Sequence, residues 1–235
     1  MGMPIGIDVR DPDTEPAALD AAFDWLRLVD RTFSTYRADS EISRLARGEL
    51  TIAECRPEVN EVLTRCAQLS EETAGYFSVR AAGTLDPSGL VKGWAVARAA
   101  DILSDAGRRS FAINAGGDVV LRGEREWRIG IRHPLERDRL AAVLAGSDIA
   151  IATSGEYERG AHVIDPHTGR PPSGLLSATV VGPDLATADA YATAVFAMGA
   201  DGPQWAAGRP GYETLCITTD HTVLTSPGLD RYRIS

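Results

Sequence analysis

Hydrophobic residues in this chain recur at helical spacing through most of its first half and at strand spacing through most of its second half. In the segment ALDAAFDWLRLVDRTF, apolar residues fall three and four positions apart, as on one face of an amphipathic helix. The same spacing returns over residues 59–69, with Gly75 as the expected C-terminal cap, and residues 89–106 form a further helical stretch that Gly107 ends. These three segments predict helices that pack against a core.

Short apolar runs separated by turn residues make up most of the remaining sequence. The early segment PIGIDVR alternates apolar and polar side chains, which predicts a strand. Further strands are expected in FAIN, DVVLRG, EWRIGIRH, DIAIATSG, HVIDP, LLSATVVGP, YETLCITT and HTVLTS, with one helix between them at about residues 188–198. The chain is therefore expected to be of the α+β class, with mixed sheets and packing helices, as one domain over residues 1–235 or as two closely packed lobes.

Charge and composition exclude several classes of protein. The chain has 24 Lys and Arg against 33 Asp and Glu, a net charge of −9, which is the wrong sign for a protein whose main partner is nucleic acid. No apolar run approaches the roughly 20 residues that span a bilayer, and the opening MGMPIGIDVRDPD is not a signal peptide, so we expect a cytoplasmic protein with no membrane span. Cys55, Cys66 and Cys216 form no CxxC pair and indicate neither a disulfide framework nor a structural zinc site.

The first candidate site is LDPSGLVKGWAVARAAD, residues 85–101. The small residues Ser88, Gly89 and Gly93 allow a ligand to approach the backbone, and a helix that starts here offers its N-terminal dipole to an anion. Lys92 adds a point charge suited to a phosphate. The spacing is neither that of a P-loop nor GxGxxG, so a capped amphipathic helix is an equally open interpretation.

The second candidate is INAGGD, residues 113–118. Gly116 and Gly117 follow a predicted strand and favour a tight turn that can lie against a ring or a phosphate. Asn114 and Asp118 can hydrogen-bond a ligand, or they can simply tie the turn.

The third candidate is the polar stretch over residues 151–171, which includes Ser154 and His162. If HVIDP is a strand, strict alternation puts the side chains of His162 and Asp165 on opposite faces, which argues against a dyad of the two. His162 can then be either a structural histidine or a residue that contacts ligand. The other three histidines are interpreted as structural.

The fourth candidate is LATADAYATAVFAMG, in which Asp189 and Thr193 are four residues apart and share one helix face. A carboxylate and a hydroxyl are oxygen ligands of the kind that Mg²⁺ takes together with waters and phosphate oxygens. Stabilisation of the helix start by Thr187 and Asp189 is the alternative.

Taken in order, six motifs resemble those of the FAD:protein FMN transferase family, also called ApbE-type proteins: MGMP, FSTYRADSEIS, LDPSGLVKGWAVARAAD, INAGGD, ATSGEYERGAHVIDPHTGRP and ADAYATAVFAMG. The resemblance covers nearly the whole chain and is strongest to a short, actinobacterial-type branch. It implies an ApbE-type, T-fold-like architecture. It also implies an enzyme that uses Mg²⁺ to transfer the FMN half of FAD to a threonine hydroxyl of a target flavoprotein, with release of AMP.

The resemblance also implies roles for individual residues. Asp189 and Thr193 match the metal-binding pair, with a backbone carbonyl near Gly89 as a third ligand. His162 matches a histidine near the flavin and the phosphates, and His162 and Asp189 are the expected catalytic residues. Together with the candidate sites above, the expected FAD contacts are Met1, Tyr36, Asp86, Lys92, Asn114, Gly116, Gly117, Ser154 and His162.

One segment departs from the family pattern, and two other functions could use the same residues. The stretch SVRAAGTL, between Phe77 and Asp86, is much shorter than in many relatives, which carry a loop with aromatic flavin contacts there. The alternative functions are a Mg²⁺-dependent FAD pyrophosphatase that gives FMN and AMP, and a protein that binds FAD without turning it over. The sequence does not identify the target flavoprotein.

Overall fold

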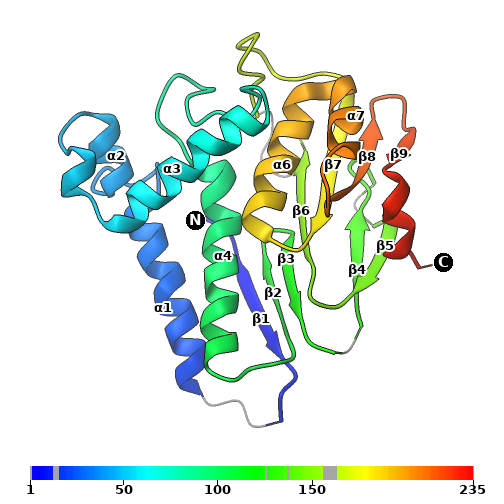
Figure 1. Cartoon of the computed structure of the whole chain (residues 1–235), viewed down its shortest axis with the longest axis horizontal. Coiled ribbons are helices and arrows are strands. Elements are labelled where there is room, and N and C mark those ends of the chain that lie inside the picture. Colours follow the sequence, from blue (N-terminus) through cyan, green and yellow to red (C-terminus); the bar gives the residue numbers. More distant parts are fainter. Residues whose placement is uncertain (1, 13–15, 125, 137, 156–162, 235) are drawn as a thin grey trace.

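The structure is a computed structural model that describes residues 2–12, 16–124, 126–136, 138–155 and 163–234. Its centre is a seven-stranded sheet in the order β1-β2-β3-β6-β7-β8-β9, in which every neighbouring pair is antiparallel (Figure 1). The strands of this sheet are β1 (Ile5–Val9), β2 (Phe111–Ala115), β3 (Asp118–Arg122), β6 (Ala150–Gly155), β7 (Leu175–Gly182), β8 (Glu213–Thr218) and β9 (Val223–Thr225). A separate two-stranded sheet pairs β4 (Trp127–Arg132) with β5 (Leu140–Gly146).

Helices α4 (Ser88–Asp105) and α6 (Leu185–Met198) pack on one face of the seven-stranded sheet (Figure 1). Helices α1 (Pro16–Phe33) and α3 (Pro57–Glu72) lie on the same side and pack against α4. Their apolar faces share a core with residues such as Ile113 of β2 and Val120 of β3. The short helical segments are α2 (Glu41–Ala46), η1 (Ile52–Glu54), η2 (Gly199–Asp201), α7 (Gly202–Ala207) and η3 (Pro227–Arg231).

Helices α4 and α6 approach each other closely at Gly93. A Cβ atom added at Gly93 would lie 2.5 Å from the carbonyl oxygen of Leu185 and 2.8 Å from the Cβ of Asp189. Glycine is the residue that permits so close an approach between two helix backbones. This contact places the first turns of α4 beside Asp189.

The sheet of β4 and β5 covers part of the opposite face of the seven-stranded sheet. Trp127, Ile131 and Leu144 pack there in a second core with residues of β3, β6, β7 and β8. The same face is left open where β1 pairs with β2 at Gly6 and Asn114, both of which are exposed. The turn between β2 and β3 has Gly116 and Gly117 at φ +60° and +98°, angles that favour glycine, and the Asn114 side chain accepts a hydrogen bond from the Gly117 amide at 3.1 Å.

The α+β prediction is confirmed, and most predicted elements are present. Helix α6 begins earlier than predicted, at Leu185, because the Asp184 carboxylate accepts a hydrogen bond from the Thr187 amide at 2.8 Å and caps the helix. The predicted strand HVIDP is wrong for residues 163–164, which are not in a strand. Within the part of the chain that the structure describes, no helix combines the length and the apolar character needed to cross a membrane.

Candidate active site

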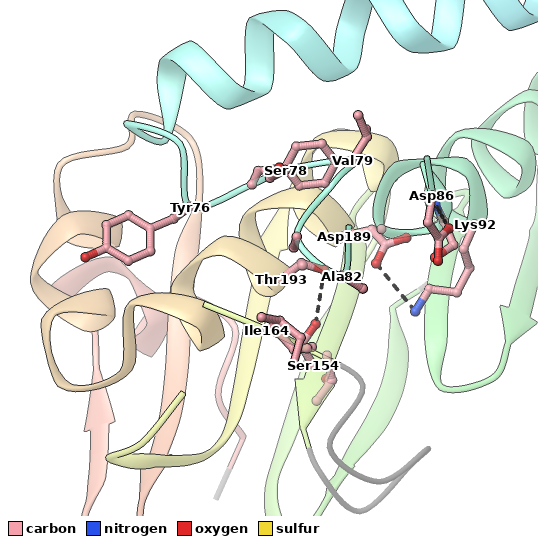
Figure 2. Close-up of a pocket in the computed structure, with 16 residues that line it drawn as sticks. Tyr76, Ser78, Val79, Ala82, Asp86, Lys92, Ser154, Ile164, Asp189 and Thr193 are labelled. Carbon is pink, nitrogen blue, oxygen red and sulfur yellow. Dashed lines mark hydrogen bonds and ion pairs between the residues drawn. The ribbon is translucent and has the colours of Figure 1, made fainter. Parts of the chain in front are cut away.

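A pocket of about 130 Å³ opens where α4, α6 and the end of β6 meet two loops (Figure 2). Residues from three of the sequence motifs line it, among them Asp86, Ser88, Gly89, Lys92, Thr153, Ser154, Asp189 and Thr193. Its loop walls come from residues 76–82 and from Val163 and Ile164. The fold thus brings together groups that lie up to about 110 positions apart in the sequence, as expected for a binding pocket at the ends of strands and helices.

Three charged side chains lie side by side at this pocket. The Lys92 ammonium is 2.6 Å from Oδ2 of Asp118 and 3.4 Å from Oδ1 of Asp189, and both carboxylates are almost fully buried (Figure 2 shows Lys92 and Asp189). Backbone amides complete the arrangement, because Gly93 N–H donates to Asp189 at 2.9 Å and Thr153 N–H donates to Asp118 at 3.1 Å. Buried charges need partners of this kind, since removal from water costs several kcal/mol per ion. The arrangement holds two carboxylates and one ammonium in fixed positions.

Burial and neighbouring charges change the pKa of the Asp189 carboxyl group. Burial is the largest influence and raises the pKa of Asp189 above its ordinary value. The Lys92 ammonium opposes that rise, the Asp118 carboxylate adds to it, and the hydrogen bond from Gly93 N–H opposes it. A cation bound at the Asp189 carboxylate would favour its ionised form.

The oxygen atoms around Asp189 suit a magnesium ion. Thr193 lies one helical turn after Asp189, and its hydroxyl is 3.4 Å from that of Ser154. The Gly89 backbone is also close, since a Cβ added there would lie 3.5 Å from the Thr193 hydroxyl oxygen. Among the described residues there is no cluster of three or more His, Cys, Asp or Glu side chains that could hold a metal. One carboxylate with hydroxyl and carbonyl oxygens nevertheless fits Mg²⁺, which commonly binds through few protein groups plus waters and phosphate oxygens.

A second, smaller pocket of about 80 Å³ adjoins the first, and Asp86, Ser88 and Lys92 line both. Tyr36 lines this second pocket and is 95% exposed. The Asp86 carboxylate accepts a hydrogen bond from the Ser88 amide at 2.9 Å, at the start of α4. The two predicted FAD contacts Tyr36 and Asp86 therefore border one continuous site.

Three further predicted FAD contacts lie outside these two pockets. Asn114, Gly116 and Gly117 line a separate groove, which meets the first pocket at Thr153. Met1 and His162 lie outside the described residues.

The sequence did not reveal every important residue of the site. Asp118 was interpreted as a ligand contact or a turn residue, whereas it is the nearer ion-pair partner of Lys92. These two residues are 26 positions apart, so only the pairing of β3 in the sheet brings them together. The pocket wall at Tyr76 is not predicted by the sequence, because an isolated aromatic residue in a loop has no periodic pattern.

Comparisons with known proteins agree with this architecture. The sequence model of the ApbE family matches residues 1–84 and 78–216. An FAD:protein FMN transferase from Rhodobacter capsulatus is 34% identical over 184 residues, which cover 72% of this chain and 35% of that protein. One from Treponema pallidum is 30% identical over 210 residues, which cover 75% of this chain and 58% of that protein. The matched segment is therefore about a third to three fifths of the length of these relatives.

Solved structures extend the similarity to the whole chain. A flavin transferase ApbE from Vibrio cholerae superposes with a TM-score of 0.85 at 26% identity, covering 99% of this chain and 96% of that one. An ApbE protein from Thermotoga maritima has a TM-score of 0.88 at 22% identity, covering 100% and 97%, which shows the shared fold. The family match over most of the sequence and the common architecture show that this chain belongs to the ApbE family.

Proposed function

We propose that this chain transfers the FMN half of FAD to a threonine hydroxyl of a target flavoprotein, with Mg²⁺, and releases AMP. The observation that carries the proposal is the pocket in which Asp189 and Thr193 of α6 meet Gly89 and Lys92 of α4. Relatives that match this chain are named FAD:protein FMN transferases, which supports the same reaction here.

The reaction needs no covalent intermediate on the enzyme. The acceptor oxygen forms a new bond to the phosphorus of the FMN phosphate, and the bond from that phosphorus to the bridging oxygen breaks. AMP leaves with the bridging oxygen, and the hydroxyl proton passes to a base. Such phosphoryl transfers depend mainly on positioning and on neutralisation of charge.

The residues of the pocket can supply both requirements. The Asp189 carboxylate, the Thr193 hydroxyl and a backbone carbonyl near Gly89 are the groups that would hold Mg²⁺. Bound there, the ion would offset the negative charge of the FAD pyrophosphate. The Lys92 ammonium is a second positive charge at the same pocket, fixed by Asp118. Tyr36 and Asp86 would contact FAD at the adjoining pocket.

His162 is the proposed proton acceptor. A general base of this kind contributes about 10²- to 10⁴-fold to a rate. This role rests on the resemblance of the HVIDP motif to the family pattern.

One experiment separates the proposed transfer from the two alternative functions. The protein is incubated with FAD and Mg²⁺, with and without a candidate flavoprotein domain, and AMP and protein-bound flavin are measured by chromatography and mass spectrometry. AMP that appears only with the domain, together with covalent FMN on a threonine, supports transfer. AMP without any acceptor indicates a pyrophosphatase, and retained intact FAD without AMP indicates a binding protein.

A further inference from the structure

A groove of about 640 Å³ lies beside the proposed FAD site, on the face of the seven-stranded sheet opposite the helices. One wall is the second half of β4, and the other side is formed by β1 and the turn between β2 and β3. The groove exists because the sheet of β4 and β5 packs over β3, β6, β7 and β8 but leaves Gly6 of β1 and its partner Asn114 of β2 exposed.

The wall formed by β4 is a free strand edge. Within the described part of the chain, β4 pairs only with β5. The outer edge of β5 is already paired with the C-terminal segment, because Ile234 N–H donates to Val143 at 3.2 Å and Ala145 N–H donates to Tyr232 at 2.6 Å. A strand edge that faces a groove offers a row of backbone donors and acceptors to an extended peptide.

The floor of the groove leaves room for side chains of such a peptide. Gly6 is exposed in the middle of β1, and a Cβ added there would meet no atom within 4 Å. Gly116 and Gly117 likewise carry no side chain into the groove. A third strand placed beside β4 would therefore pack over β1 and β2 at the ordinary spacing of two stacked sheets, about 10 Å.

The groove and the pocket of the proposed reaction site share one lining residue. Thr153 lines both the groove and the first pocket. Its amide is hydrogen-bonded to Asp118, whose other carboxylate oxygen contacts Lys92. A chain lying in the groove would therefore reach the pocket at Thr153.

The charge of the groove favours an acidic occupant. Among the described residues that line it, Arg132 is the only charged one. It lies at the end of β4, and Arg128, on the same exposed face of β4, is not part of the lining.

We infer that this groove binds the acceptor segment of the target protein as an extended strand added to the free edge of β4, with an acidic side chain at Arg132 and the acceptor hydroxyl at the Thr153 end. This inference rests on the proposed function. It specifies where on this chain the target protein binds, and that the groove prefers an acceptor segment with acidic side chains.

The first test fills the groove. Gly6→Trp places a large side chain in open space, whereas Asp8→Trp puts the same group on the same face of β1, outside the groove lining. The probes are two synthetic 14-residue peptides with one central threonine, one flanked by aspartates and one by lysines. Flavin incorporation is measured by mass spectrometry, and FAD affinity by quenching of flavin fluorescence. We expect Gly6→Trp to lower incorporation at least tenfold at unchanged FAD affinity, and Asp8→Trp to have less than a twofold effect.

The second test reverses the charge. Wild-type protein should label the aspartate peptide faster than the lysine peptide. Arg132→Glu should reverse that preference, and the matched control Arg128→Glu should retain it.

The outcomes distinguish the groove from the proposed function. If wild-type protein labels the peptides but Gly6→Trp and Asp8→Trp behave alike, the groove is not the acceptor site. If wild-type protein cleaves FAD but labels neither peptide, the reaction is hydrolysis, so the proposed transfer fails and the inference fails with it. If Arg132→Glu weakens FAD binding as much as it lowers labelling, Arg132 serves FAD and the inference is wrong. If wild-type protein neither binds nor cleaves FAD, the proposed function itself fails, and the inference fails with it.

Discussion

Gly93→Ala tests the close approach of α4 and α6 that assembles the site. The added Cβ would lie 2.5 Å from the Leu185 carbonyl oxygen and 2.8 Å from the Asp189 Cβ, well inside ordinary van der Waals contact. Both neighbours are fixed within α6, so the two helices must separate.

The expected cost follows from two opposing effects. Overpacking of a core position lowers the free energy of unfolding by about 1–3 kcal/mol. Replacing glycine by alanine inside a helix raises it by up to about 1 kcal/mol. We expect the free energy of unfolding to fall by about 1–2 kcal/mol. For a chain of this size, that corresponds to a decrease in Tm of roughly 2–8 °C. FAD affinity should fall as well, because Lys92 moves away from Asp189.

Gly89→Ala is the matched control in the same helix. Its Cβ would meet the Phe77 ring at 3.2 Å and the Thr193 hydroxyl at 3.5 Å, and both are side-chain atoms that can adjust. Urea unfolding followed by circular dichroism gives the midpoint and slope for each variant. We expect the midpoint of Gly89→Ala to stay close to that of the wild type. A Gly93→Ala protein as stable as the wild type would refute the close helix contact.

Three further predictions concern FAD binding, proton transfer and the cysteines. Asp86→Ala should weaken FAD binding measured by fluorescence quenching; unchanged affinity with a loss of about 0.5–2 kcal/mol in stability would instead assign Asp86 to capping. His162→Ala should lower turnover by about 10²- to 10⁴-fold while the Mg²⁺ dependence of AMP release stays the same, and rescue by excess Mg²⁺ would contradict a role in proton transfer. Burial raises the pKa of Cys66 and Cys216 to about 12 and also raises the pKa of Cys55, and none of the three lines the first or second pocket. AMP release should therefore be unaffected by dithiothreitol or by iodoacetamide at pH 7.5, and inactivation with the fold intact by circular dichroism would show that a thiol matters.

The helices with a periodic apolar pattern could be predicted from the sequence, because burial of one apolar face determines their structure. In α1 and α3, apolar residues at three- and four-residue spacing become the buried face. Strand β5 has no such signal: its sequence LAAVLAG lacks polar alternation and β-branched residues apart from Val143, so it was not predicted. The HVIDP prediction failed because residues 165–170 form a turn, in which the Gly169 amide donates to the Asp165 carbonyl at 2.8 Å.

The site was predictable where its residues are close in sequence. Asp189 and Thr193 share a helix face, and their spacing alone placed them together. The pairing of Lys92 with Asp118 depends on the position of β3 in the sheet, which strand periodicity does not reveal. The groove beside β4 depends on which strands the small sheet covers, a long-range property of the fold.

The dependence of AMP release on Mg²⁺ in wild-type protein and in Asp189→Ala tests the central claim most directly. Asp189 is the only carboxylate among the three proposed metal ligands, so its removal should weaken Mg²⁺ binding at the FAD pyrophosphate. We expect turnover by Asp189→Ala to fall steeply and to recover in part as Mg²⁺ is raised, with the half-saturating Mg²⁺ concentration shifted upward at least tenfold. If Asp189→Ala cleaves FAD with the Mg²⁺ dependence of the wild type, Asp189 does not bind the metal and the proposed site is wrong.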